Sequence, residues 1–98
     1  MFNKLKQVMD LKKQGKQMQE ILAQERVEGS AEWGKVKIDM DGTMRVHQVL
    51  IDDSLLSAKS KLQNAIAEAV NDAIKKVQPL AAEKLKKSGL MPDIFGGK

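Results

Sequence analysis

The chain has 98 residues, 31% of them charged, and a formal net charge of +4 at neutral pH, so we expect one small domain with a modest core. It contains no cysteine, which excludes disulfides and thiolate metal sites and fits a reducing compartment. No apolar run approaches the roughly 20 residues that span a bilayer, and the first residues lack a signal peptide's apolar stretch. We therefore expect a cytoplasmic protein with no membrane partner.

The charge is divided unevenly along the chain. Residues 1–19 carry five lysines against one acid, residues 20–53 carry four basic residues against eight acids, and residues 54–98 carry eight lysines against four acids. The net charges of the three stretches are therefore +4, −4 and +4. Basic ends around an acidic middle indicate an anionic partner or, alternatively, a solvated lysine-rich surface.

Residues 2–25 are predicted to form a helix, because apolar side chains recur there at steps of three and four. They are Phe2, Leu5, Val8, Met9, Met18, Ile21 and Leu22. The stripe they form is narrow, like the seam between two helices. Gly15 lies in its middle and would let another helix approach closely. We therefore expect this helix to have a partner.

Residues 26–52 predict a short antiparallel sheet of three strands. "VEG" begins it, "AEWG" contains a turn, "KVKIDM" alternates apolar and polar residues, and "DG" is a hairpin signal. A two-residue loop would pair Ile38 with Arg45. A three-residue loop over residues 40–42 would pair Ile38 with Met44 and place Gly42 at the left-handed position of a bulged turn. We predict the three-residue loop.

The stretch "TMRVHQVLID", residues 43–52, changes the phase of its alternation at His47 and Gln48. A β-bulge there would return Val49 and Ile51 to the face of the apolar residues on the preceding strand. His47 is the only histidine, and we interpret it as a surface residue with a water or backbone partner. A pH switch or a phosphate contact is the alternative.

Trp33 is the only large aromatic side chain of the predicted sheet. If Gly34 opposes Val49, Trp33 lies beside Leu50 on the second face of the sheet, and a helix or a partner chain would cover that face. Otherwise Trp33 is an aromatic residue at the end of a hairpin, without a partner.

Residues 54–78 predict a second helix, with Asp53 or Ser54 as its N-cap. We interpret the adjacent carboxylates of Asp52 and Asp53 as helix caps, because acids are favoured at helix N-termini. Pro79 ends this helix or begins the next, and "LAAEKLKKSG" predicts a short third helix closed by Gly89. Residues 91–98 are predicted to be a flexible tail. The expected fold is α+β in the order α-β-β-β-α-α, with a small antiparallel three-stranded sheet.

The sequence offers no constellation for catalysis. One histidine and no cysteine leave no recognisable metal site. No nucleophile has a base at a motif spacing, and no glycine-rich phosphate loop lies between a strand and a helix. We therefore expect a protein that is not an enzyme, with no cofactor, no metal and no small-molecule substrate.

Three stretches, "KQGKQMQEILAQERVEGSAEWGKVKIDMDG", "VLIDDSLL" and "LQNAIAEAVNDAIKKV", together resemble the YbaB/EbfC family of bacterial nucleoid-associated proteins. The resemblance covers nearly all of residues 5–80 in the family's order. It implies one domain over residues 1–90 and a tweezer-like homodimer with a central sheet region and projecting helical arms. It also implies binding to double-stranded DNA in the nucleoid with little sequence specificity, an effect on DNA organisation or gene expression, and no enzymatic activity.

The chain departs from the family pattern at a few positions. Relatives often carry arginines near the end of the third strand, where this chain has His47 and Gln48, so a DNA contact there would be weakened at neutral pH. The turn "SAEWG" has fewer glycines, and Gly15 stands where alanine is common.

We expect DNA contacts to come from lysines on the helical arms, which would neutralise phosphates and release counterions. The candidates are Lys4, Lys6, Lys12, Lys13 and Lys16 on the first helix, and Lys84, Lys86 and Lys87 on the third. Lys75 and Lys76 are secondary candidates. No set of side chains is suited to reading base edges.

Two alternatives to a DNA-binding protein stay open from the sequence. The narrow stripe of the first helix would equally suit a dimeric protein-interaction adaptor without direct DNA binding. The same helix, with lysines beside an apolar stripe, could also dock on anionic lipid, although its stripe contains no tryptophan and one phenylalanine.

Overall fold

The structure is a computed structural model that describes residues 2–89, with side chains from residue 11 onward. The elements are α1 (Phe2–Ala23), β1 (Arg26–Ala31), the 3-10 turn η1 (Glu32–Gly34), β2 (Val36–Asp41), β3 (Val46–Ile51), the 3-10 turn η2 (Asp53–Leu55) and α2 (Lys59–Ser88). The predictions of an α+β fold, of the first helix and of three antiparallel strands are confirmed.

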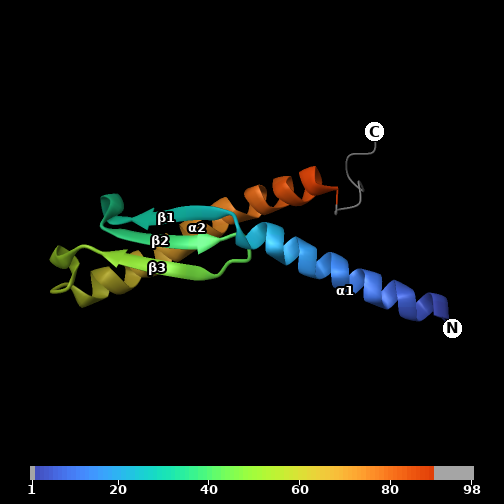
Figure 1. The fold of residues 1–98 in the computed structure, drawn as a ribbon. Helices are drawn as coiled ribbons and strands as arrows, with labels where there is room; N and C mark the ends of the chain where they lie inside the picture. The colour runs from blue at the N-terminus through green and yellow to red at the C-terminus, as the bar shows by residue number, and fades with distance from the viewer. Residues whose placement is uncertain (1, 90–98) are drawn as a thin grey trace.

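The three strands lie in the order β1-β2-β3, and α2 packs across one face of the sheet against β1 and β2. Figure 1 shows α2 behind the strands, with α1 and the C-terminal part of α2 extending beyond the sheet at the same end and diverging from each other. We call these two extensions the arms. The sheet and the covering part of α2 form the body that carries them.

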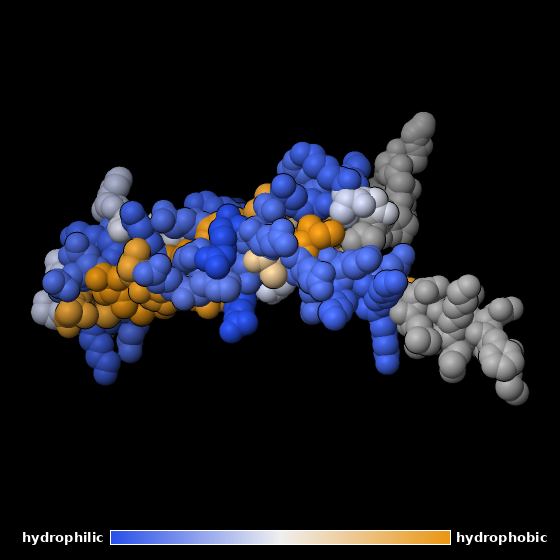
Figure 2. Space-filling model, in the orientation of Figure 1, coloured by the Kyte–Doolittle hydropathy of each residue, from blue (hydrophilic) through white to orange (hydrophobic). Residues whose placement is uncertain are grey.

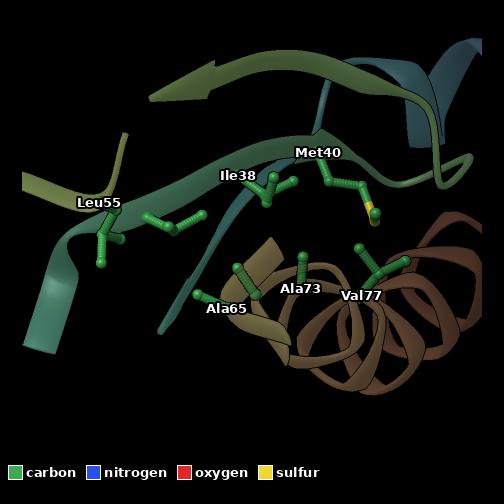
Figure 3. Close-up of a cluster of buried hydrophobic side chains, with 8 residues drawn as sticks. Ile38, Met40, Leu55, Ala65, Ala73 and Val77 are labelled. Carbon is green, nitrogen blue, oxygen red and sulfur yellow. The ribbon is translucent and has the colours of Figure 1, made fainter. Parts of the chain in front are cut away.

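The core lies between β2 and α2 (Figure 3). Val36, Ile38 and Met40 alternate along β2 and are fully buried, and they face a row of small residues on α2. The row is Ala65, Ala69, Ala73 and Val77, whose spacing of four places them on one side of the helix. Alanines let the helix backbone come close to the sheet, and this closeness fixes which residues β1 can carry.

Gly29 of β1 lies where the helix comes closest. A Cβ atom at this position would lie 2.1 Å from the carbonyl oxygen of Ala69 and 2.7 Å from the Cβ of Ala73. Real atoms do not approach so closely, so the helix could not pack at its present distance over any other residue. Glycine is required here for space and not for backbone freedom.

α2 is one continuous helix of 30 residues with Pro79 inside it, so the predicted break and the separate third helix are wrong. Proline lacks the N–H that would bond the preceding turn and normally kinks or breaks a helix. Here Val77 before it is buried, and Leu80 and Ala81 after it are half-buried. Packing on both sides of Pro79 holds the helix together. Gly89, with φ of 76°, closes it as expected, and the predicted tail lies outside the described residues.

The segment before α2 also differs from expectation. Asp52, and neither Asp53 nor Ser54, acts as the cap: its carboxylate accepts a hydrogen bond from the Ser54 N–H at 2.8 Å. It caps η2, and α2 begins later, at Lys59. The interpretation of the acidic pair as a capping element therefore holds for Asp52, whereas the predicted helix start is wrong.

The predicted β-bulge is confirmed. Ile38 pairs with Val49 and Met40 pairs with Val46, so His47 is the extra residue on β3. Because of this extra residue, the apolar side chains on both sides of the bulge share the face of the sheet that α2 covers elsewhere.

The predicted turn between β2 and β3 has the right length, three residues, but the wrong position. β2 continues to Asp41, whose N–H donates to the Arg45 carbonyl at 2.9 Å, so the loop lies at residues 42–44. Met44 takes the left-handed conformation with φ of 70°, and Gly42 does not. Gly42 is needed for another reason: a Cβ there would lie 2.5 Å from the carbonyl oxygen of Leu22 at the end of α1.

Trp33 lies at the hairpin end in η1 and is fully exposed. Of the two alternatives for Trp33, the one in which Gly34 opposes Val49 is wrong, because Val49 pairs with Ile38 and Gly34 lies outside the strands. Trp33 is therefore the unpartnered hairpin aromatic among the described residues, and it is not part of a second apolar face beside Leu50.

Candidate nucleic-acid interface

Among the residues whose side chains the structure describes, the two arms meet at their base and nowhere else. The last turns of α1 contact α2, with Ile21 and Leu22 half-buried, and the Glu25 carboxylate lies 3.6 Å from the Lys84 Nζ. Toward its N-terminus α1 leaves this contact: Leu11 is 66% exposed and no atom lies within 4 Å of a Cβ placed on Gly15. Residues 11–17 of this arm are therefore a solvent-exposed stretch of helix.

The exposed part of α1 carries a group of lysines that we call the α1 lysine patch: Lys12, Lys13 and Lys16. All three are exposed, and none forms an ion pair with any described residue. Spacings of three and four residues place Lys16 beside both of the others on the helix surface. Lys4 and Lys6 lie on α1 as well, in the part whose side chains the structure does not describe.

The predicted lysines of α2 are less available. Lys84 lies 3.6 Å from Glu25, and Lys87 lies 2.8 Å from Glu83, so acids offset both charges. Lys86 is exposed and has no ion pair within the described part of the chain. The structure thus divides the sequence-predicted set into a free patch on α1 and a mostly paired group on α2.

The secondary candidates divide in the same way. The Lys76 ammonium donates to the Glu28 carbonyl at 2.8 Å and lies 3.2 Å from Asp72, so it is engaged at the edge of the sheet. Lys75 is exposed and forms no ion pair with a described residue. Sequence spacing could not separate these neighbours, because the backbone partner of Lys76 lies on another element.

The outer face of the sheet is not strongly basic. The Arg26 guanidinium lies 2.7 Å from the Asp39 carboxylate, and a shallow hollow beside this pair is lined by Glu28, Lys37, Asp39, Gln48 and Leu50. Charges of both signs alternate there. An unopposed positive surface is found on the α1 arm and not on this face.

His47 has a partner that the sequence did not indicate. Its Nε2 lies 2.6 Å from a carboxylate oxygen of Asp41, whose side chain is only 3% exposed. Burial disfavours the charge of Asp41, but hydrogen bonds from Thr43, His47 and Arg45 outweigh it and hold the pKa of this carboxyl well below its usual range. The expectation of a water or backbone partner for His47 is therefore wrong. We missed Asp41 because we assigned it to the loop and not to the strand.

Figure 2 shows hydrophobic surface gathered over β3 and the segment that follows it. The large exposed side chains there are Val46, Val49, Leu50 and Leu56; we call them the β3 apolar surface. Val49 is 45% and Leu50 is 50% exposed although they lie on opposite faces of one strand. β3 is also an edge strand, and no described residue hydrogen-bonds to its outer edge.

Other kinds of site find no support in the described part of the chain. No helix between residues 2 and 89 is long and apolar enough to span a bilayer. Within those residues, no group of three or more histidine, cysteine, aspartate or glutamate side chains could hold a metal ion.

The sequence and the fold match known proteins. The chain is similar to the uncharacterized protein HP0035 from Helicobacter pylori, whose crystal structure superposes with a TM-score of 0.65 at 25% identity, over 86% of this chain and 98% of that chain. A family model described as the YbaB/EbfC DNA-binding family matches residues 1–90. The chain therefore belongs to the YbaB/EbfC DNA-binding family.

Proposed function

We propose that the protein is a nucleoid-associated homodimer that binds double-stranded DNA with little sequence specificity and affects DNA organisation or gene expression. The family is a DNA-binding, non-enzymatic one. The observation that carries the proposal for this chain is the α1 lysine patch, three exposed lysines without acidic partners among the described residues, on a helix that projects from the body.

The mechanism is electrostatic. Each lysine that approaches a phosphate releases a condensed counterion, so the logarithm of the affinity falls with the logarithm of the salt concentration by about 0.9 per contact. Lys12, Lys13 and Lys16 are the main contacts, Lys4, Lys6 and Lys86 add to them, and Lys84 and Lys87 contribute less because acids offset their charge. In this mechanism the lysines contact the phosphate backbone, and phosphate contacts carry no sequence information, which gives little sequence preference.

The dimer is supported by the two unsatisfied features of β3. A strand with a free edge and apolar side chains on both faces is prone to pair with another chain. The β3 apolar surface consists of four aliphatic side chains, and a second copy would offer the same apolar strand, as a two-fold interface requires. Pairing through β3 would set two pairs of arms on one body, and two lysine patches on one duplex would bind more tightly than one.

The proposal predicts that Lys12→Glu with Lys13→Glu abolishes DNA retardation while the protein stays folded and dimeric. The matched control is Lys35→Glu with Lys59→Glu, two exposed lysines away from the arms. Both double variants lower the formal net charge by four, from +4 to 0. The arm variant should lose binding, and the control should retain most of it.

The outcome of this comparison decides between functions. Equal losses in the two variants would mean that overall charge, and not the α1 lysine patch, governs binding. No binding of the unsubstituted protein at low salt would contradict the proposal and favour the alternative of a dimeric adaptor that binds another protein.

A further inference from the structure

The turn between β2 and β3 carries the base of the α1 arm. The Gly42 N–H donates to the carbonyl oxygens of Leu22, at 2.9 Å, and Glu25, at 3.2 Å. Both acceptors lie at the C-terminal end of α1 or just after it. The turn and the helix end are in direct backbone contact at Gly42, so the turn supports the last turn of α1 together with the contact of α1 with α2.

The shape of that turn is held by the buried carboxylate of Asp41. It accepts hydrogen bonds from the Thr43 N–H at 2.7 Å, the Thr43 hydroxyl, the Arg45 N–H at 3.3 Å and the His47 ring at 2.6 Å. The turn includes Met44 in a left-handed conformation that residues other than glycine rarely adopt, so it needs such support.

His47 is able to make its bond because of the bulge. As the extra residue of β3 it lies outside the regular pairing, and its ring reaches back to Asp41. Arg26, the residue paired with Asp41 on β1, bonds Asp39 instead. His47 is therefore the only side-chain nitrogen that bonds Asp41 among the described residues.

We infer that Asp41 and His47 are positioning residues for the DNA-binding arm: they fix the turn on which α1 rests and so set the angle at which the lysine patch meets DNA. The inference rests on the proposed function of that patch. Lys12 lies ten residues from Leu22, about 15 Å along the helix. A tilt of about 10° at the base would move Lys12 by roughly 3 Å, close to the 3.4 Å rise between successive phosphates of one strand.

The test compares Asp41→Asn with Asp39→Asn. Both residues lie on β2 and bind a basic side chain, but Asp39 has no bond to the turn. Three donors bond Oδ1 of Asp41 and the His47 ring bonds Oδ2. The amide introduced by Asp41→Asn is neutral and replaces one of these two acceptor oxygens with an NH2 group. In Asp41→Asn the arm should take a broader range of angles, and the DNA affinity should fall at least fivefold. In Asp39→Asn the range of arm angles and the DNA affinity should be unchanged.

The arm angle is measured without DNA, by the spin-label distance between α1 and α2. The chain has no cysteine, so Leu11→Cys and Ala82→Cys, both at exposed positions, place one label on each arm. Dilution of labelled chains with unlabelled chains isolates the distance within one chain. The distance distribution should broaden in Asp41→Asn and stay narrow in Asp39→Asn.

A second pair of variants tests the histidine and serves where Asp41→Asn does not fold. His47→Leu removes the donor, whereas His47→Gln keeps an N–H that can donate to Asp41. The distribution of distances between the two labels should broaden in His47→Leu. In His47→Gln it should be as narrow as in the unsubstituted protein. Distributions equal to that of the unsubstituted protein in Asp41→Asn, or in His47→Leu, would overturn the inference. If the distances change as predicted but the unsubstituted protein does not bind DNA, the proposed function is overturned and the positioning role of Asp41 and His47 is not.

Discussion

The two edges of the sheet are treated in opposite ways. At β1, side chains of α2 occupy the edge: Asp72 accepts from the Ser30 N–H at 3.0 Å, and Lys76 donates to the Glu28 carbonyl at 2.8 Å. At β3, no described residue bonds to the edge. One edge is closed within the chain, and the other is open.

The difference follows from where α2 lies. The helix crosses the sheet over β1 and β2, so its alanine row buries the residues of β2 and its polar residues reach the edge of β1. Val46 and Val49 of β3 lie on the same side of the sheet but beyond the helix. An open edge with apolar side chains is prone to pair with another chain, and it is the edge through which we propose that two copies join.

The largest effect is expected from a charge placed on the open edge. Val49→Lys should raise the dissociation constant of the dimer at least 100-fold, because an unpaired charge in an apolar seam costs several kcal/mol. Glu28→Lys introduces the same side chain at an exposed position of β1 and should leave the dimer intact. The mass in solution, measured by light scattering across a dilution series, distinguishes them. If Glu28→Lys were monomeric and Val49→Lys dimeric, the dimer would form through β1 and not through β3.

At the closed edge, β1, we expect a substitution to destabilise the fold by disrupting the packing of α2 on the sheet. Gly29→Ala should lower the free energy of unfolding by about 3 kcal/mol, at the upper end of overpacking effects, because its methyl would meet the Ala69 carbonyl at 2.1 Å. Gly15→Ala meets no atom within 4 Å and should raise it by about 0.5–1 kcal/mol, since alanine is the better helix former. Urea denaturation measures both. Equal changes in the free energy of unfolding for the two variants would mean that α2 does not pack closely against β1 at Gly29.

Low pH should weaken the stabilising effect of Asp41 in the turn before β3. The pKa of Asp41 is lowered in the folded protein, so its stabilising effect is fully present above its ordinary value of 3.8. Below that value the effect is lost progressively, as the pH falls toward the lowered pKa of the folded state. Asp41→Asn should cost about 2–3 kcal/mol at neutral pH, as expected for losing charge-assisted hydrogen bonds. Denaturation at pH 7 and pH 3 should show that the difference between the two proteins shrinks in acid. A constant difference would contradict the buried charge.

The smallest effect is expected from opening the closed edge. Asp72→Ala frees the Ser30 N–H and should give a measurable increase in species larger than a dimer at high concentration. Glu68→Ala removes an exposed acid one turn earlier on α2 and should not. Sedimentation velocity at increasing concentration compares them. Identical profiles would show that Asp72 does not protect the edge.

Periodicity was enough to predict α1, the three strands and the bulge. The stripe from Phe2 to Leu22 indicated α1, the alternation of Val36, Ile38 and Met40 indicated β2, and the change of phase at His47 indicated the bulge. Each of these signals is local: side chains that face one direction repeat at the period of their own backbone.

The wrong predictions concern positions whose structure depends on contacts with distant parts of the chain. Pro79 stays within a helix because packing on both sides outweighs its missing donor. Gly42 lies close to α1, which leaves the left-handed position to Met44. Likewise, the pairing of Lys84 with Glu25 joins residues that lie far apart in the sequence. A list of lysines could therefore not show which of them remain available for phosphates.

The central claim, that the open edge joins two copies whose lysine arms bind DNA, is tested most directly by one titration. A short duplex is titrated at about 50 and 200 mM salt while the mass of the complex is measured in parallel. We predict two copies of the chain per bound duplex and an affinity that falls steeply with salt, with each phosphate contact adding about 0.9 to the log–log slope. A single copy per duplex, or a slope near zero, would contradict the account.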